Sequence, residues 1–263
     1  MKITHISDLH YGEFSGTDNL INHIITYYQN ERVKPKIVLS GDLVDFSLDK
    51  KDMGELKIKL KKLTSHDFDL MICPSNHDLK REGATGSPKR NLKVFNKYFK
   101  DLLPKGVNYK GEEDNDLLDY PIIHQFNDHF FIGLNSLEGK PLLTRGKLGK
   151  NQLKELKSDL ARIRKEHNDP KIIVYLHNNP FSFSYKYKWL KLVDREKFRI
   201  LIKDVNVLLS GHWHSNKRYR TEEGKYNINV IQVTGASTAY NFISWTEIDT
   251  SDYSVKPIRI DDY

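Results

Sequence analysis

The feature that most constrains the fold is a series of short apolar runs, each of which ends in a polar cluster. Five such runs, rich in Ile and Val, are followed by the clusters DLH at 8–10, GDLVD at 41–45, NHD at 76–78, HNNP at 177–180 and GHWH at 211–214. The runs have the length of buried strands, and they alternate with stretches of helical period. This alternation predicts an α/β fold.

The spacing of the clusters supports this interpretation. Asp8 and Asp42 are 34 residues apart, as are Asp42 and Asn76, and His177 precedes His212 by 35 residues. This is about the length of one strand and helix unit, and the segments share no other residues that would indicate a repeat. If the strands are parallel, the clusters meet at the carboxyl edge of a sheet, where open α/β sheets bind their ligands.

The predicted elements follow from the same patterns. Strands are predicted at 2–7, 36–40, 69–73, 120–126, 129–134, 171–176 and 206–210, and helices at 18–30, 51–64, 88–100, 150–167 and 194–203. From Lys217 onward the chain alternates short strands with turns, which favours antiparallel β-structure. No linker-like stretch interrupts it, so we predict one domain over residues 1–263 with a mixed sheet core.

Composition narrows the function classes. No apolar run approaches the roughly 18 residues of a membrane helix, and the first ten residues read as a strand and not as a secretory signal. Cys73 is the only cysteine, so no internal disulfide is expected and the cytoplasm is the predicted location. An excess of 42 basic over 35 acidic residues gives a net charge of +7, which favours an anionic partner.

The residues that converge at the predicted sheet edge have the chemistry of metal ligands. An isolated Asp or Asn after a strand is usually a turn former. Here two aspartates, one asparagine and four histidines recur in order, which is too many donors for one tetrahedral zinc ion and suits two ions of the Mn, Fe or Zn type. Such pairs most often serve phosphoester hydrolysis.

These motifs resemble those of the calcineurin-like metallophosphoesterase superfamily, whose pattern is D-x-H, G-D-x-x-D, G-N-H-D, a later His, and G-H-x-H. The resemblance extends from Asp8 to His214. It implies a four-layer α/β/β/α sandwich with two mixed sheets. It also implies that one metal ion is held by Asp8, His10 and His214, that the other is held by Asn76, His177 and His212, and that Asp42 bridges them.

The resemblance also implies roles for three neighbouring residues. His77 would contact the substrate phosphate and protonate the leaving oxygen, and Asp78 would orient its ring. Asp45 would hydrogen-bond a ligand. The sequence departs from the family pattern at two places, since Ser75 stands where glycine is usual and Asn178 where a second histidine is common. Neither position is a ligand, so we expect both to affect substrate shape, and Asn178 to contact the substrate.

Two basic loops are candidates for substrate recognition. One begins with Lys80 and Arg81, and the other alternates aromatic and basic residues at Tyr185, Lys186 and Tyr187. Aromatic and basic side chains in alternation favour binding of nucleotides or single strands, although such a segment can equally pack its aromatic face on the core.

We therefore expect a phosphoester hydrolase with two metal ions, and within it a phosphodiesterase acting on a nucleotide-type substrate. The compact chain, which has no separate cap domain, resembles the cyclic-nucleotide phosphodiesterase branch of the superfamily. A nuclease of the same superfamily and a metal-poor, non-catalytic scaffold remain the alternatives. The oligomeric state does not follow from the sequence, and no membrane partner is expected.

Overall fold

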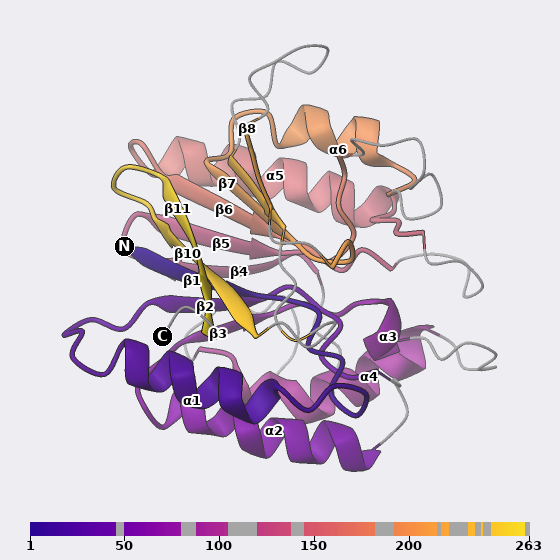
Figure 1. The fold of residues 1–263 in the computed structure, drawn as a ribbon. Helices are drawn as coiled ribbons and strands as arrows, with labels where there is room; N and C mark the ends of the chain where they lie inside the picture. Colours follow the sequence, from indigo (N-terminus) through magenta and orange to yellow (C-terminus); the bar gives the residue numbers. More distant parts are fainter. Residues whose placement is uncertain are drawn as a thin grey trace.

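The structure is a computed structural model that describes residues 1–45, 50–79, 88–104, 120–137, 145–181, 192–214, 217–220, 231–234, 238 and 243–260; at 88–89, 217–220 and 231–234 it describes the backbone alone. Two sheets face each other in the middle of the molecule, with helices on both outer sides (Figure 1). The predicted four-layer α/β/β/α sandwich with two mixed sheets is confirmed.

The first sheet carries the N-terminal strand in its centre. Its strand order is β11-β10-β1-β2-β3. The strands are β1 (Lys2–Ile6), β2 (Lys36–Leu39), β3 (Leu70–Ile72), β10 (Ser244–Asp249) and β11 (Ser254–Arg259). β1, β2 and β3 are parallel, whereas β10 is antiparallel to both β1 and β11. The three parallel strands therefore end at the same edge.

The second sheet has the order β4-β5-β6-β7-β9-β8. Its strands are β4 (Ile122–Phe126), β5 (His129–Gly133), β6 (Lys171–Tyr175), β7 (Val207–Ser210), β8 (Lys217–Arg220) and β9 (Ile231–Thr234). β5, β6, β7 and β9 are parallel, and the outer strands β4 and β8 are antiparallel to their neighbours.

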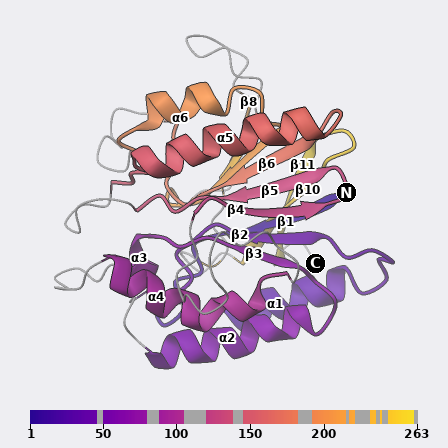
Figure 2. The same cartoon turned by 180° about the vertical axis from the view of Figure 1, so that it is seen from behind.

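Helices cover the outer face of each sheet. α1 (Thr17–Tyr27), α2 (Lys50–Thr64) and α4 (Pro88–Phe99) lie against the first sheet, and α5 (Lys150–Glu166) and α6 (Arg195–Leu201) against the second (Figure 2). In α5 the buried apolar residues Leu153, Leu156, Leu160 and Ile163 recur at the three- and four-residue spacing of one helix face. A short helix, α3 (Asn76–Leu79), and a 3-10 turn, Lys100–Leu102, complete the described elements.

Strand alternation divides the apolar residues of the second sheet between two cores. Phe131 and Ile173 belong to the cluster shared with the first sheet, whereas the neighbouring Phe130 and Ile172 pack in the cluster that contains the buried residues of α5. Successive side chains of a strand point to opposite faces, so one strand contributes to both cores. This packing holds the two sheets together behind the edge where the polar clusters lie.

The C-terminal region differs from its prediction. The hairpin of β8 and β9 and the pair of β10 and β11 are antiparallel as expected, but β9 lies parallel to β7 in the second sheet. Local alternation of residues is the same in both kinds of pairing, so it does not distinguish them. The sequence also did not predict α3, which begins directly at Asn76.

Candidate dinuclear metal centre

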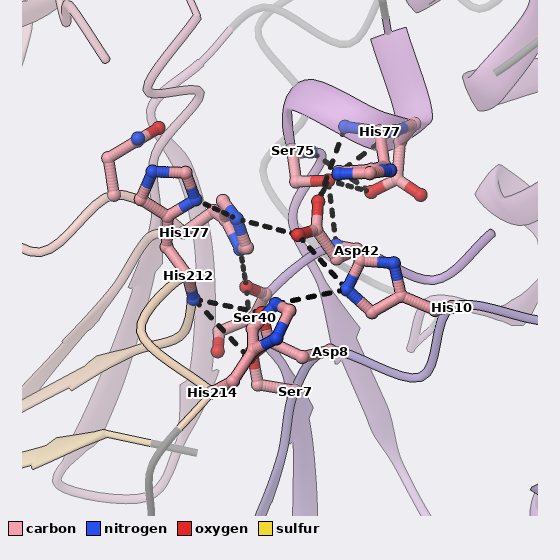
Figure 3. A network of polar contacts seen from close by, with 12 residues as sticks. Ser7, Asp8, His10, Ser40, Asp42, Ser75, His77, His177, His212 and His214 are labelled. Atoms are coloured by element: carbon pink, nitrogen blue, oxygen red, sulfur yellow. Dashed lines mark hydrogen bonds and ion pairs between the residues drawn. The ribbon is translucent and has the colours of Figure 1, made fainter. Parts of the chain in front are cut away.

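The polar clusters meet at the carboxyl edges of the two sheets. Asp8 and His10 follow β1, Asp42 follows β2, Asn76 follows β3, His177 follows β6, and His212 and His214 follow β7. Figure 3 shows the side chains of Asp8, His10 and Asp42 approaching those of His177, His212 and His214 from the opposite sheet. The chain thus brings residues more than 200 positions apart into one cluster.

One group of donors consists of Asp8, His10, Asp42 and His214. His10 Nε2 lies 3.1 Å from His214 Nε2 and 3.6 Å from Asp42 Oδ2, and His214 Nε2 lies 3.4 Å from Asp8 Oδ1. The other ring nitrogen of His10, Nδ1, is 3.3 Å from Asp45 Oδ1. The Asp45 carboxylate thereby directs Nε2 toward the other donors, as second partners of metal-bound histidines do.

A second group consists of Asp42, His177 and His212, so Asp42 belongs to both groups. His177 Nε2 lies 3.1 Å from Asp42 Oδ2 and 3.1 Å from His212 Nδ1. His177 Nδ1 donates to the carbonyl oxygen of Ser40 over 2.8 Å, which leaves Nε2 for the site. The sequence did not single out Ser40, because its contribution comes from a backbone carbonyl that any residue could supply.

The donor geometry fits two metal ions. Donors bound to one ion at about 2.0–2.1 Å lie about 3.0–3.4 Å apart in octahedral or tetrahedral arrangements, which is close to the separations found here. Within the described residues, the buried Asn76 Oδ1 has no hydrogen-bond partner. Because a buried carbonyl oxygen without a partner is costly, a cation beside it is the simplest explanation of its position. The residues present therefore suit the expected dinuclear centre.

Five of the expected ligands have backbone conformations that are uncommon for non-glycine residues. The φ angles are positive at all of them: 56° at Asp8, 44° at His10, 50° at Asp42, 73° at His212 and 45° at His214. Left-handed backbone at residues other than glycine is uncommon and clusters at functional sites. Each loop turns sharply after its strand, and this turn directs the side chain into the shared cluster.

Two glycines allow the loops to approach this closely. A Cβ atom on Gly41, whose φ is +87°, would lie 2.6 Å from Ser75 Cβ and 2.9 Å from His177 Nδ1. A Cβ on Gly211 would lie 1.9 Å from Ser7 Oγ and 2.7 Å from Asp8 Oδ2. Both glycines directly precede ligand-bearing turns, so they are required by the packing of the loops and not by flexibility.

Charge is distributed unevenly among the buried ligands. Burial by itself would raise the pKa of Asp42, but the attraction and hydrogen bond of His177 lower it well below its ordinary value. Burial would likewise lower the pKa of His177, yet the charges of Asp42 and Asp8 raise it to about 9. Burial and the charge of His177 lower the pKa of His212 to about 3. The carboxylates thus favour positive charge next to them, which a bound cation would supply.

His77 lies at the open side of the cluster. Its side chain is 38% exposed, whereas that of Asp42 is 1% exposed. His77 Nδ1 donates to the carbonyl oxygen of Asp45 over 2.9 Å and lies 3.2 Å from Asp45 Oδ1. Burial by itself would lower the pKa of His77, but the charge of Asp42 and the contacts with Asp45 raise it above its ordinary value.

The expected role of Asp78 is wrong. Its carboxylate accepts hydrogen bonds from the backbone N–H groups of Leu43, Val44 and Ser75, and its Oδ2 lies 2.8 Å from the Ser75 hydroxyl oxygen, while Asp45 holds the His77 ring. Asp78 therefore fixes the loop after β2 against α3. Burial and the charge of Asp42 raise the pKa of Asp78 to about 6. Asp45 serves two histidines, His10 and His77.

Asn178 also differs from its expectation as a substrate contact. Its side chain is fully buried, and its Oδ1 accepts a 2.8 Å hydrogen bond from the Ser136 hydroxyl. The backbone N–H of Asn178 donates to the same hydroxyl, so the residue joins the loops after β5 and β6. The other substrate candidates, Lys80, Arg81, Tyr185, Lys186 and Tyr187, lie outside the described residues.

Ser75 is the second departure from the family pattern, and its side chain lies beside the expected metal ligands. The sequence predicted an effect on substrate shape, and the structure adds that the Ser75 hydroxyl contacts the Asp42 carboxylate directly. The sequence signal for this contact is that a residue with a hydroxyl directly precedes the expected ligand Asn76.

Comparison with known proteins agrees with this geometry. A family model described as calcineurin-like phosphoesterase matches residues 1–216. A search of the curated proteins finds no match. In the part of the chain that the structure describes, none of the helices combines the length and apolar character needed to cross a membrane.

Solved structures show the same fold at low identity. A dimetal phosphatase from Danio rerio is 14% identical with a TM-score of 0.62, and the match covers 94% of this chain and 91% of that one. A protein from Thermus thermophilus is 10% identical with a TM-score of 0.59, covering 98% of both chains. A 5'-nucleotidase precursor from the same organism is 14% identical with a TM-score of 0.54; the match covers 98% of this chain but only 54% of that one. Because the family model matches most of its length, this chain belongs to the calcineurin-like phosphoesterase family.

Proposed function

We propose that this chain is a phosphodiesterase that hydrolyses a nucleotide-type phosphodiester with two transition-metal ions of the Mn, Fe or Zn type. The observation that carries the proposal is the pair of donor groups that share Asp42, with His77 at their open side. One ion would be held by Asp8, His10, Asp42 and His214. The other would be held by Asp42, Asn76, His177 and His212.

Each part of the site has a chemical task in this proposal. Two bound ions would supply a nucleophile from water and neutralise charge on the phosphoryl oxygens. The ligand residues hold these charges in place before the substrate arrives, which is the basis of electrostatic preorganisation. His77 would contact a phosphoryl oxygen and donate a proton to the leaving oxygen, while Asp45 holds its Nδ1 so that Nε2 is free for this transfer.

The preference for a nucleotide-type diester is supported by two features of the sequence. The chain is similar to the compact cyclic-nucleotide phosphodiesterase branch, and its net charge of +7 favours an anionic substrate. Both the phosphatase and the 5'-nucleotidase among the similar structures are less than 25% identical, so they support the fold and make a phosphomonoester a necessary comparison.

A substrate panel tests the proposal. The Mn²⁺-loaded protein would be incubated with a cyclic mononucleotide, a cyclic dinucleotide, a nucleoside 5'-monophosphate and single-stranded DNA, and product formation measured by chromatography. We expect the highest kcat/KM on one of the two cyclic diesters. Activity on the nucleoside monophosphate alone would show that the protein is a phosphomonoesterase and not a phosphodiesterase.

A nuclease is the alternative favoured by the basic and aromatic sequence at Lys80, Arg81 and Tyr185–Tyr187. Cleavage of the polymer without cleavage of either cyclic diester would establish it. A metal-poor scaffold is distinguished by elemental analysis of the purified protein, because it would carry well under two metal ions per chain.

A further inference from the structure

We propose that Ser75 is a positioning residue that orients the Asp42 carboxylate, so that a single oxygen, Oδ2, faces both groups of metal ligands. The inference rests on the dinuclear centre of the proposed function and deepens it. Ser75 lies between β3 and α3 and is fully buried. Figure 3 shows its side chain directed at Asp42.

The Ser75 hydroxyl contacts Asp42 at two points. Its oxygen accepts a 2.7 Å hydrogen bond from the backbone N–H of Asp42, and its proton is donated to Asp42 Oδ1. The backbone at Asp42 is in the left-handed region, with φ at 50°. One hydroxyl therefore restrains both the strained backbone and the carboxylate of the same residue.

The two carboxylate oxygens of Asp42 face different partners. Oδ1 receives the Ser75 hydroxyl and the backbone N–H of His77, the latter over 3.3 Å. Oδ2 lies 3.1 Å from His177 Nε2 in one donor group and 3.6 Å from His10 Nε2 in the other. Rotation of the carboxylate would exchange these roles, and the contacts to Oδ1 oppose that rotation.

The single hydroxyl proton has two carboxylates within reach, because Asp78 Oδ2 lies 2.8 Å from Ser75 Oγ. Asp78 Oδ2 already accepts the backbone N–H of Ser75 over 3.0 Å, whereas within the described residues Asp42 Oδ1 otherwise accepts the longer, 3.3 Å hydrogen bond from the backbone N–H of His77. The Ser75 hydroxyl oxygen also lies closer to Asp42 Oδ1 than to Asp78 Oδ2. A buried carboxylate oxygen is stabilised most where donors are fewest, so the proton is assigned to Asp42.

Loss of the hydroxyl should therefore weaken metal binding at the shared ligand. We expect Ser75→Ala and Ser75→Gly to bind Mn²⁺ about 10- to 100-fold more weakly at the weaker of the two sites, as is typical when a partner of a metal ligand is removed. Affinity would be measured by competition with a chelator. Electron paramagnetic resonance of the Mn²⁺-loaded proteins would report the magnetic coupling of the two ions, which we expect to decrease because it depends on the bridging carboxylate.

Thr4→Val is the matched control, because Thr4 is also fully buried and its hydroxyl donates to Tyr28, away from the ligands. It should keep the wild-type affinity and coupling. Ser75→Gly places at this position the residue that is usual in the family pattern, so it provides a second variant if Ser75→Ala does not fold.

The possible outcomes distinguish a failure of the role proposed for Ser75 from a failure of the proposed dinuclear centre. If the wild-type protein binds two coupled Mn²⁺ ions and either folded Ser75 variant does so with unchanged affinity and coupling, the role of Ser75 is wrong and the dinuclear centre stands. A lowered melting temperature in EDTA with unchanged Mn²⁺ binding would also overturn it, since this would show a purely structural role. A wild-type protein that binds well under two ions would overturn the proposed function itself, and the role of Ser75 with it.

Discussion

Three of the expected ligands are each held through one atom so that another is free. His10 is held at Nδ1 by Asp45, His177 at Nδ1 by the Ser40 carbonyl, and Asp42 at Oδ1 by Ser75. In each case the opposite atom faces the other donors. A ligand that is already oriented loses less entropy when an ion binds, so these contacts favour a preformed site.

Asp42→Asn tests the shared ligand. The amide removes the negative charge that faces both donor groups, so we expect metal content below two ions per chain and loss of activity. Elemental analysis and hydrolysis of a diester would measure both. Asp101→Asn is the control, because it removes an exposed carboxylate that pairs with Lys57 far from the ligands. A fully metallated, active Asp42→Asn protein would refute the assignment.

His77→Ala tests the proton donor. This residue is not among the expected ligands, so the variant should keep its two metal ions. We expect a loss of roughly 10²–10⁴ in kcat on a substrate with a poor leaving group, such as a cyclic nucleotide. On an activated aryl phosphodiester the loss should be much smaller, because that leaving group needs no proton. Equal losses on the two substrates would show that His77 has another role.

Residue identity alone did not reveal which neighbour holds His77. Asp78 is adjacent in the sequence, but it lies within the short helix α3 and its carboxylate is engaged by the loop after β2. Asp45, 32 residues from His77, supplies the contact. Asp and His side chains are short, so the path of the backbone decides which of them meet.

At the scale of elements, the strand ends explain the site better than any single residue does. The parallel strands β1, β2 and β3 and the parallel strands β6 and β7 all terminate where the ligands begin. Five ligands then take left-handed backbone, each at an expected cost of about 1–3 kcal/mol. Backbone hydrogen bonds between the turns, such as Asp8 N–H to Gly41 O and His10 N–H to Asp42 O, help to offset that cost.

A buried histidine in the outer strand β4 should make the stability of the folded protein depend on pH. His124 in β4 is buried, and within the described residues neither ring nitrogen has a hydrogen-bond partner. Burial lowers the pKa of His124 to about 4, from 6.5 for an exposed histidine. Between about pH 6.5 and pH 4, His124 is therefore protonated in the unfolded chain but stays neutral in the folded chain. The free energy of unfolding should fall as the pH is lowered from about 6.5 to about 4.

His124→Leu should remove this contribution. At about 1.4 kcal/mol for each pKa unit, the wild-type protein would lose up to about 3 kcal/mol over that pH range for this reason, and the variant would lose correspondingly less. Urea unfolding at pH 7 and pH 4.5 measures the difference. The control is His23→Gln, because His23 is exposed on α1. If the free energy of unfolding fell by the same amount between pH 7 and pH 4.5 in the wild type and in His124→Leu, His124 would not be the cause of the acid sensitivity.

At the scale of the whole molecule, the site joins the two sheets. Asp8, His10, Asp42 and Asn76 come from the first sheet, and His177, His212 and His214 from the second. The backbone N–H of His212 donates to the Asp8 carboxylate, and His177 donates to Ser40, so the sheets are already connected at this edge. Ions bound to donors from both sheets would strengthen that connection.

Metal removal should therefore lower the melting temperature. An ion present at 100 times its dissociation constant stabilises the folded state by about 2.7 kcal/mol. For a chain of this size that corresponds to a rise of about 5–10 °C for each ion. Differential scanning fluorimetry of the protein with EDTA and with added Mn²⁺ would measure it. Identical melting curves would argue against a metal site shared by the two sheets.

The formal net charge of the chain does not describe the charge at the site once metal ions are bound. The formal charge of +7 does not include two divalent ions, which would add about +4 at a site where Asp8 and Asp42 contribute two negative charges. The local field at the site would then come mainly from the ions. The excess of lysine and arginine would serve to attract and hold an anionic ester.

The sequence by itself determined the α/β class, the two mixed sheets implied by its family resemblance, and the positions where polar clusters follow strands. These features depend on local periodicity and on motif order, which can be seen without coordinates. Only the tertiary structure decided that β9 runs parallel to β7, that Asp45 and not Asp78 holds His77, that Asn178 is buried against Ser136, and that Ser75 holds Asp42. These features depend on distances between loops far apart in the chain, and the packing of the two sheets sets those distances.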